Sequence, residues 1–256
     1  MPALSWPALL PLGLGYSLAL VYGNLGPASL PTFGALVCAA LLARRPVRWQ
    51  QVAGHILFIA LAIALAVHWL PGFHGAKVID QAIFSEGALP FSMYLNLDKP
   101  LIGFWLLLTC PWVLAWRIWR TSLVFILPLT VLVCLGGAWA LGIVTWAPKW
   151  PDQAWLWLLN NLLLVSLTEE LLFRGYIQGG LQRLFGHDHL ALFAAALLFG
   201  SAHLGAGWQW FCLASLAGMG YGLAYRHGGL MAAVLCHFGV NLAHFAGFSY
   251  PMLALG

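Results

Sequence analysis

The sequence predicts an all-helical integral membrane protein, a bundle of about eight or nine transmembrane helices forming one domain over residues 1–256. Two features of composition predict this class: 62% of the residues are hydrophobic and only 7% are charged. A soluble domain carries about 25% charged residues and has no means of covering so much apolar surface. The third observation is a series of apolar runs, most of them near the length that crosses a bilayer as a helix.

Nine apolar runs, separated by Gly, Pro, His or Arg, give the helix count. They cover residues 4–22, 30–43, 52–70, 101–116, 123–146, 154–169, 190–204, 208–225 and 229–248. The second and seventh runs are short for a bilayer span, so eight is the alternative count. The first run lacks a basic leader and a small-residue cleavage site, and we expect it to be retained as a helix.

The basic residues divide between the two ends of these helices. If successive helices cross the bilayer in alternating directions, seven arginines fall on one side and three lysines on the other. The arginines are Arg44, Arg45, Arg48, Arg117, Arg120, Arg183 and Arg226, and the lysines are Lys77, Lys99 and Lys149. Because positive residues favour the cytoplasmic side, we expect the N-terminus inside and the loop 71–100 outside a bacterial cytoplasmic membrane. The net charge of +4 is small, and the basic residues are scattered over loops. This distribution argues against nucleic acid as a partner, so the lipid bilayer is the expected surroundings of the protein.

Charged residues that an apolar span rarely carries occur in the run after residue 154. An ionisable side chain at mid-membrane costs at least about 2.5 kcal/mol on insertion scales, so it needs a partner or a function. Glu170 and Arg174 are i,i+4, share a helix face and are expected to form a structural ion pair. Glu169 lies about 100° round the helix from Glu170, so the arginine satisfies it less well and it can point into a cavity.

Histidines and an asparagine interrupt the apolar runs that follow. His203 ends the segment 199–203, and alone it is more often a core residue bonded to a backbone carbonyl than a functional group. His237 and Asn241 are one turn apart on one face, with His244 roughly one more turn along. Hydrogen bonding between helices is the alternative explanation for that pair.

Depth in the membrane decides whether these polar residues can meet. At about 1.5 Å per residue, Glu169, His203 and His237 each lie roughly 16 to 23 Å from the nearest charged residue at the arginine end of their helices. The sequence therefore predicts that all three share one layer near the middle of the bilayer.

Together, EExxxR, FxxxH and HxxxN on successive membrane helices resemble the CAAX-protease and bacteriocin-processing family, also called CPBP or Abi. The motifs span residues 169–241, and we expect the corresponding catalytic core at 154–248. Members of this family are glutamate-type intramembrane endopeptidases, best known for removing a C-terminal tripeptide from prenylated proteins.

The resemblance implies a peptidase in which Glu169 and His203 hold and activate a water molecule. It also implies that His237 and Asn241 stabilise the oxyanion, while Glu170 and Arg174 brace the helix. No metal or other cofactor is implied, and the expected substrate is a membrane-anchored protein or peptide. The chemistry is compatible, since a carboxylate serves as a general base and a carboxamide donates hydrogen bonds at any pH.

Three alternatives stay open. A zinc-dependent intramembrane protease is one, because Glu169, His203 and His237 make a plausible ligand set, although the common HExxH helix is missing. A non-catalytic membrane scaffold or immunity-type protein is another, because a motif does not guarantee turnover. A transporter ranks last, since the sequence has no inverted repeat with paired broken helices.

Overall fold

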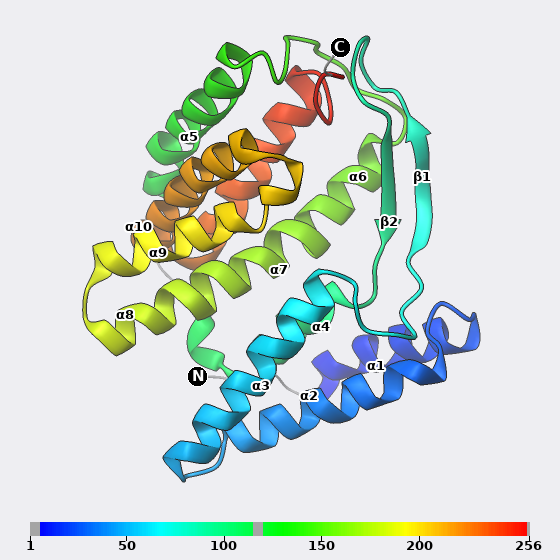
Figure 1. The fold of residues 1–256 in the computed structure, drawn as a ribbon, viewed down its shortest axis with the longest axis vertical. Coiled ribbons are helices and arrows are strands. Elements are labelled where there is room, and N and C mark those ends of the chain that lie inside the picture. The colour runs from blue at the N-terminus through cyan, green and yellow to red at the C-terminus, as the bar shows by residue number, and fades with distance from the viewer. Residues whose placement is uncertain (1–5, 115–119, 255–256) are drawn as a thin grey trace. The chain divides into compact units, whose positions relative to one another are not determined.

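The computed structural model of the chain describes residues 6–114 and 120–254, with side chains for 13–114 and 123–254. Most of these residues are helical (Figure 1). The chain divides into two compact units: unit 1 is Met1–Val78 with Tyr94–Pro111, and unit 2 is Ile79–Met93 with Trp112–Gly256. The predicted helical architecture is confirmed for the described residues, and the single domain stays a prediction.

The described part of unit 1 contains four α-helices. They are α1 (Trp6–Val21), α2 (Leu30–Ala43), α3 (Arg48–Ala66) and α4 (Lys99–Thr109). Trp105 of α4 stacks on Phe58 of α3 with ring centroids 3.7 Å apart, and its indole N–H donates to the Leu36 carbonyl of α2 at 2.9 Å. This buried tryptophan therefore ties three helices together, satisfying its own polar group while it fills the core.

The loop 71–100 contains a two-stranded sheet that the sequence analysis did not predict. Strands β1 (Ala76–Ala82) and β2 (Phe91–Leu95) pair with each other, and the boundary between the units falls within them. Both strands have ordinary lengths, but the burial of β1 does not alternate strictly. An alternating pattern of apolar and polar residues, the usual signature of a half-buried strand, is therefore weak here.

Unit 2 contains a continuous helical segment, Ala154–Phe185. It consists of α6 (Ala154–Asn160), a π-helical stretch (Asn161–Ser166), α7 (Leu167–Glu170), a second π-helical stretch (Leu171–Gln178) and α8 (Gly179–Phe185). Gly186 follows in the left-handed conformation with φ 70°, which ends the helix and favours glycine. Helix α9 (Asp188–Ser201) then follows and packs against the second π-helical stretch.

The last helix of unit 2, α10 (Trp208–Gly247), bends sharply at Gly229, whose φ of 74° and ψ of −169° are not helical. The two legs fold back on each other, because Tyr221 and His237, each eight residues from Gly229, stack with ring centroids 4.5 Å apart. This confirms the break expected between the runs 208–225 and 229–248. Helices α5 (Arg120–Ala140) and α9 pack against α10 (Figure 1).

An aromatic cluster closes the far end of the second leg. Trp157 stacks on Phe245 with centroids 4.1 Å apart and donates its indole N–H to the Tyr250 hydroxyl at 3.0 Å. Phe84, from the β1–β2 connection, meets Phe245 edge to face at 5.6 Å. Burial raises the pKa of Tyr250 to about 12, so this phenol stays neutral. The cluster therefore anchors the leg that carries the HxxxN motif.

Four described helices are long and apolar enough to cross a membrane: Arg48–Ala66, Leu123–Ala140, Ala154–Phe185 and Trp208–Gly247. Three apolar helices are shorter: Pro27–Ala43, Lys99–Thr109 and Asp188–Ser201. The run 101–116 gives only the short α4, which ends before Pro111 because proline has no N–H for the helix ladder. The start of the run 4–22, the end of 101–116 and Arg117 lie outside the described residues. The count of eight or nine spans stays a prediction.

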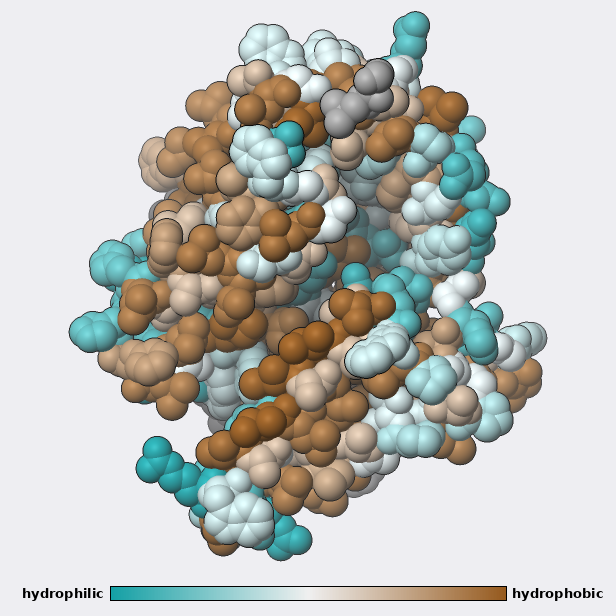
Figure 2. Space-filling view, in the orientation of Figure 1, coloured by the Kyte–Doolittle hydropathy of each residue, from teal (hydrophilic) through white to brown (hydrophobic). Residues whose placement is uncertain are grey.

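The surface of unit 2 carries its charges at opposite ends of the helices. Figure 2 shows hydrophobic residues over the helical surface and hydrophilic residues along the β1–β2 segment. Arg183 and Arg226 line one cavity at the Gly229 end of α10, whereas Lys149 donates to the Phe248 carbonyl at the other end. This separation agrees with the predicted threading of these three residues.

The predicted orientation is tested by cysteine labelling in cells. Glu86→Cys and His187→Cys, both at exposed positions, are placed in a chain whose native cysteines are replaced by alanine. We expect a membrane-impermeant maleimide to label Glu86→Cys in intact cells and His187→Cys only after permeabilisation, because arginines favour the cytoplasmic end of membrane helices. The reverse pattern would invert the topology.

Candidate active site

A cavity of about 150 Å³ inside unit 2 is lined by the four residues expected to be catalytic. Glu169 reaches it from the segment 154–185, His203 from the end of α9, and His237 and Asn241 from the second leg of α10. Most of the remaining lining is apolar. The structure thus brings three separate motifs to one place, as the predicted common depth required. A largely apolar cavity with a few convergent polar groups is typical of a binding or catalytic site.

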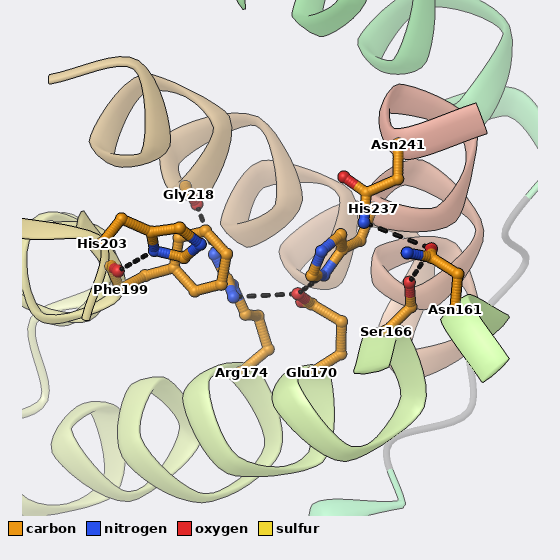
Figure 3. Close-up of polar contacts among 9 residues, drawn as sticks. All are labelled: Asn161, Ser166, Glu170, Arg174, Phe199, His203, Gly218, His237 and Asn241. Atoms are coloured by element: carbon orange, nitrogen blue, oxygen red, sulfur yellow. Dashed lines mark hydrogen bonds and ion pairs between the residues drawn. The ribbon is translucent and has the colours of Figure 1, made fainter. Parts of the chain in front are cut away.

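The expected ion pair between Glu170 and Arg174 is present. An Arg174 N–H donates to Glu170 Oε1 at 2.9 Å, and both side chains are fully buried. A second guanidinium nitrogen donates to the Gly218 carbonyl of α10 at 3.1 Å (Figure 3). The guanidinium carbon also lies 4.6 Å from the centre of the Phe199 ring. Arg174 therefore binds its own helix to both α9 and the first leg of α10.

Glu170 has a second partner that the sequence analysis missed. His237 Nδ1 lies 2.8 Å from Glu170 Oε1 (Figure 3). The imidazole stacks on the Tyr221 ring with an interplanar angle of 11°. With an ionised carboxylate as acceptor, Nδ1 carries the proton and Nε2 is left for other interactions. Glu170 thus does more than neutralise Arg174, because it also fixes the orientation of a candidate catalytic ring. Helical spacing within one segment gives no signal for this contact.

His203 makes the backbone hydrogen bond that the sequence analysis named as the alternative to a functional role. Its Nδ1 donates to the Phe199 carbonyl at 2.9 Å, four residues earlier in the last turn of α9, which ends at Ser201. Because a carbonyl only accepts, this bond places the proton on Nδ1 and leaves Nε2 of the neutral ring as an acceptor. The same ring lines the cavity. The backbone bond and a role in the cavity are therefore compatible.

Asn241 is held by a polar pair from the segment 154–185. Its amide N–H donates to Asn161 Oδ1 at 3.2 Å, and the Ser166 hydroxyl donates to the same oxygen at 3.3 Å. Asn161 and Ser166 are five residues apart, the spacing that a π-helix brings onto one face. The sequence analysis missed both residues because it assumed α-helical spacing. Single-turn π-helical stretches are frequent at functional sites.

Glu169 differs from its neighbour in its surroundings. It is half-buried and lines the cavity, and it has no hydrogen bond or ion pair with any of the described side chains. Glu170 is fully buried with two partners. The structure therefore separates the two adjacent carboxylates as helix geometry predicted: one is bound into the protein and the other is available to the cavity.

Two further polar groups face the same cavity without partners among the described residues. They are the indole N–H of Trp210, on the first leg of α10, and Nε2 of His244, on the second. Their rings lie 6.1 Å apart. Leaving a buried donor or acceptor unmet costs about 1–3 kcal/mol, so these positions suit binding of polar groups on a ligand. His244 was visible in the sequence one turn beyond Asn241, whereas Trp210 gave no signal.

The zinc alternative requires at least three suitable side chains around one point. Within 6–114 and 120–254, no three His, Cys, Asp or Glu residues are grouped in this way. His203 and His237 also each direct Nδ1 at a protein oxygen. Metal dependence stays open to direct test.

Part of the chain that lines this cavity matches one known family. Residues 151–243 match the Rce1-like family, described as type II CAAX prenyl endopeptidases. This match confirms the resemblance drawn from the three motifs, and the Rce1-like segment contains all seven residues that the motifs specify. No curated protein matches the chain. No solved structure matches it either.

Within the Rce1-like segment, Gly200 allows α9 to approach the first leg of α10. A Cβ atom there would lie 1.9 Å from the Ser215 hydroxyl and 2.7 Å from the Phe211 carbonyl oxygen. We expect Gly200→Ala to lower stability by about 1–3 kcal/mol through overpacking and to impair activity by displacing His203. Thermal unfolding measures the change. Gly136→Ala on α5, where nothing lies within 4 Å of the added atom, is the control, and equal melting temperatures would refute the close approach.

Proposed function

We propose that this protein is an intramembrane endopeptidase that hydrolyses a peptide bond of a membrane-associated substrate with a glutamate-activated water. The observation that carries the proposal is the convergence of Glu169, His203, His237 and Asn241 on one largely apolar cavity. Its second support is the match of residues 151–243 to a family of endopeptidases. The buried ion pair explains Glu170 and Arg174 as structural residues. It does not explain Glu169, which lines the cavity.

In the proposed reaction, Glu169 removes a proton from water as the oxygen attacks the carbonyl carbon of the scissile bond. His203 Nε2 accepts the second hydrogen of this water and so orients it, since Nδ1 is occupied by the Phe199 carbonyl. The proton held by Glu169 then passes to the leaving amine as the carbon–nitrogen bond breaks. Positioned general-base catalysis of this kind contributes about 10²–10⁴ in rate.

The oxyanion is stabilised by His237 and Asn241 in this proposal. One amide N–H of Asn241 is bound to Asn161, which fixes the carboxamide and leaves the second N–H for the oxyanion. His237 donates through Nε2 when the ring is doubly protonated, and Glu170 offsets that charge from the Nδ1 side. Each oxyanion donor is worth about 10²–10³ in kcat.

Cleavage of defined peptides tests the proposal. The purified full-length protein in lipid is incubated with a peptide ending in a farnesylated CAAX sequence and with its unprenylated twin, and products are identified by mass spectrometry. Release of a C-terminal tripeptide from the prenylated peptide, absent with Glu169→Gln, is the expected result. Cleavage of both peptides would support a peptidase that does not require a prenyl group on its substrate.

A non-catalytic scaffold is distinguished by comparing membrane-protein termini in cells. Cells that produce the wild-type chain are compared with cells that produce Glu169→Gln at equal abundance. A peptidase yields new C- or N-termini only with the wild-type chain. Identical sets of termini, together with inert peptides, would favour a scaffold.

Metal independence is a separate prediction. The proposed base and donors are all protein side chains, so we expect activity to survive prolonged dialysis against EDTA and 1,10-phenanthroline. Residual activity and bound metal are measured on the same sample. Loss of stoichiometric zinc together with activity, and recovery of both on adding zinc back, would establish the zinc-dependent alternative.

A further inference from the structure

A second cavity, of about 490 Å³, lies in unit 2 at the arginine end of the helices. Its lining includes Trp112, Gln178, Arg183, Asp188, Tyr225 and Arg226. None of these residues lines the candidate active site, and none belongs to the three family motifs. The lining is polar and partly aromatic, in contrast to the apolar surface of the helices around it.

The charges around this cavity favour an anion. Arg226 pairs with Asp188 at 3.2 Å, and Gln182 donates to the same carboxylate at 2.5 Å. Arg183 has no carboxylate partner among the described residues, and its guanidinium lies over the Trp112 ring at 4.3 Å. Two arginines and one aspartate leave one positive charge. Stacking on an aromatic face occupies the plane of a guanidinium and leaves its N–H edge free to bind an anion.

Trp112 is itself held in place as a platform. Its ring stacks on Tyr176 with centroids 5.8 Å apart, and a Cβ atom at Gly180 would lie 3.6 Å from the indole. Arg183 is therefore oriented by a rigid aromatic pair, although its side chain is exposed. An ordered guanidinium loses less conformational entropy when it binds a ligand.

The surface beside this cavity points to a lipid. Large apolar side chains on α8 and α9 are exposed next to it: Leu184 (76%), Phe185 (58%), Leu190 (55%) and Phe193 (54%). Hydrophilic residues at this end border a hydrophobic helical surface (Figure 2). Tryptophan, tyrosine and arginine together at the end of membrane helices are typical of the headgroup region.

We propose that this cavity binds the phosphate headgroup of an anionic phospholipid, with Arg183 as the principal contact and the acyl chains along α8 and α9. Basic pockets between membrane helices bind such headgroups, and one arginine near the membrane surface is worth about 1 kcal/mol. The proposal does not depend on peptidase activity, and its test needs no cleavage assay.

The test is native mass spectrometry of the purified full-length protein with equal amounts of dioleoylphosphatidylglycerol or dioleoylphosphatidylcholine. We expect phosphatidylglycerol to be retained preferentially. Arg183→Gln is expected to weaken its retention about fivefold, the ratio that corresponds to one arginine contact. Arg48→Gln, an exposed arginine at the start of α3, is the matched control and should retain the lipid as the wild type does.

A variant with the opposite sign separates lipid binding from a loss of structure. Asp188→Asn removes the one carboxylate of the cavity, so it should keep or strengthen phosphatidylglycerol binding even though it breaks the pair with Arg226. Equal retention by the wild type, Arg183→Gln and Arg48→Gln would overturn the site. If inorganic phosphate alone raised the melting temperature as much as phosphatidylglycerol, the ligand would be free phosphate and the lipid assignment would be wrong.

Discussion

Glu169→Gln is expected to reduce peptide cleavage by at least about a hundredfold without unfolding the protein. The substitution keeps size and hydrogen-bonding capacity but removes the base, and a positioned base supplies about 10²–10⁴ in rate. Glu169 is half-buried and has no described partner, so we expect its loss to change the free energy of unfolding by less than about 1 kcal/mol. The measurements are kcat on the peptide that the wild type cleaves and the thermal melting curve.

The control for this variant is Glu86→Gln, the same substitution at an exposed position of the β1–β2 connection. It should leave both activity and melting temperature unchanged. Normal turnover by Glu169→Gln would show that the base lies elsewhere. A large loss of stability in the same variant would instead identify Glu169 as a packing residue.

Glu170→Gln is expected to act differently, by lowering the stability of the folded protein. It removes the anion that accepts from Arg174 and His237, and leaves the guanidinium buried without its charge partner. Breaking a buried pair by removing one member costs about 3–5 kcal/mol. We therefore expect a much lower melting temperature, together with lost activity because His237 is no longer oriented.

The double variant Glu170→Gln, Arg174→Met isolates the electrostatic part of that defect. Removing both members of a buried pair costs less than removing one, so part of the stability should return. Recovery remains incomplete because Arg174 also donates to the Gly218 carbonyl. Activity should stay low, since His237 still lacks its carboxylate. Equal destabilisation by Glu169→Gln and Glu170→Gln would contradict the different roles assigned to the two carboxylates.

The sequence by itself determined the class of protein and the identity of the unusual residues. Its apolar composition leaves membrane helices as the fold, and the cost of intramembrane charge singles out Glu169, Glu170 and Arg174. The pairing of Glu170 with Arg174 was also readable, because residues four apart on a helix are neighbours whatever the tertiary structure. These features depend on the spacing of residues within one helix or on the cost of placing a charge in the bilayer. Each can therefore be judged from one segment of the sequence at a time.

Only the tertiary structure decided which residues from different helices meet. The contact of His237 with Glu170 and that of Asn241 with Asn161 depend on the bend at Gly229 and on π-helical stretches that shift the faces of the segment 154–185. Trp210 likewise joins the cavity because the two legs of α10 fold together. A periodic apolar pattern gives no register between helices, because lipid tails and neighbouring helices bury the same side chains almost equally well.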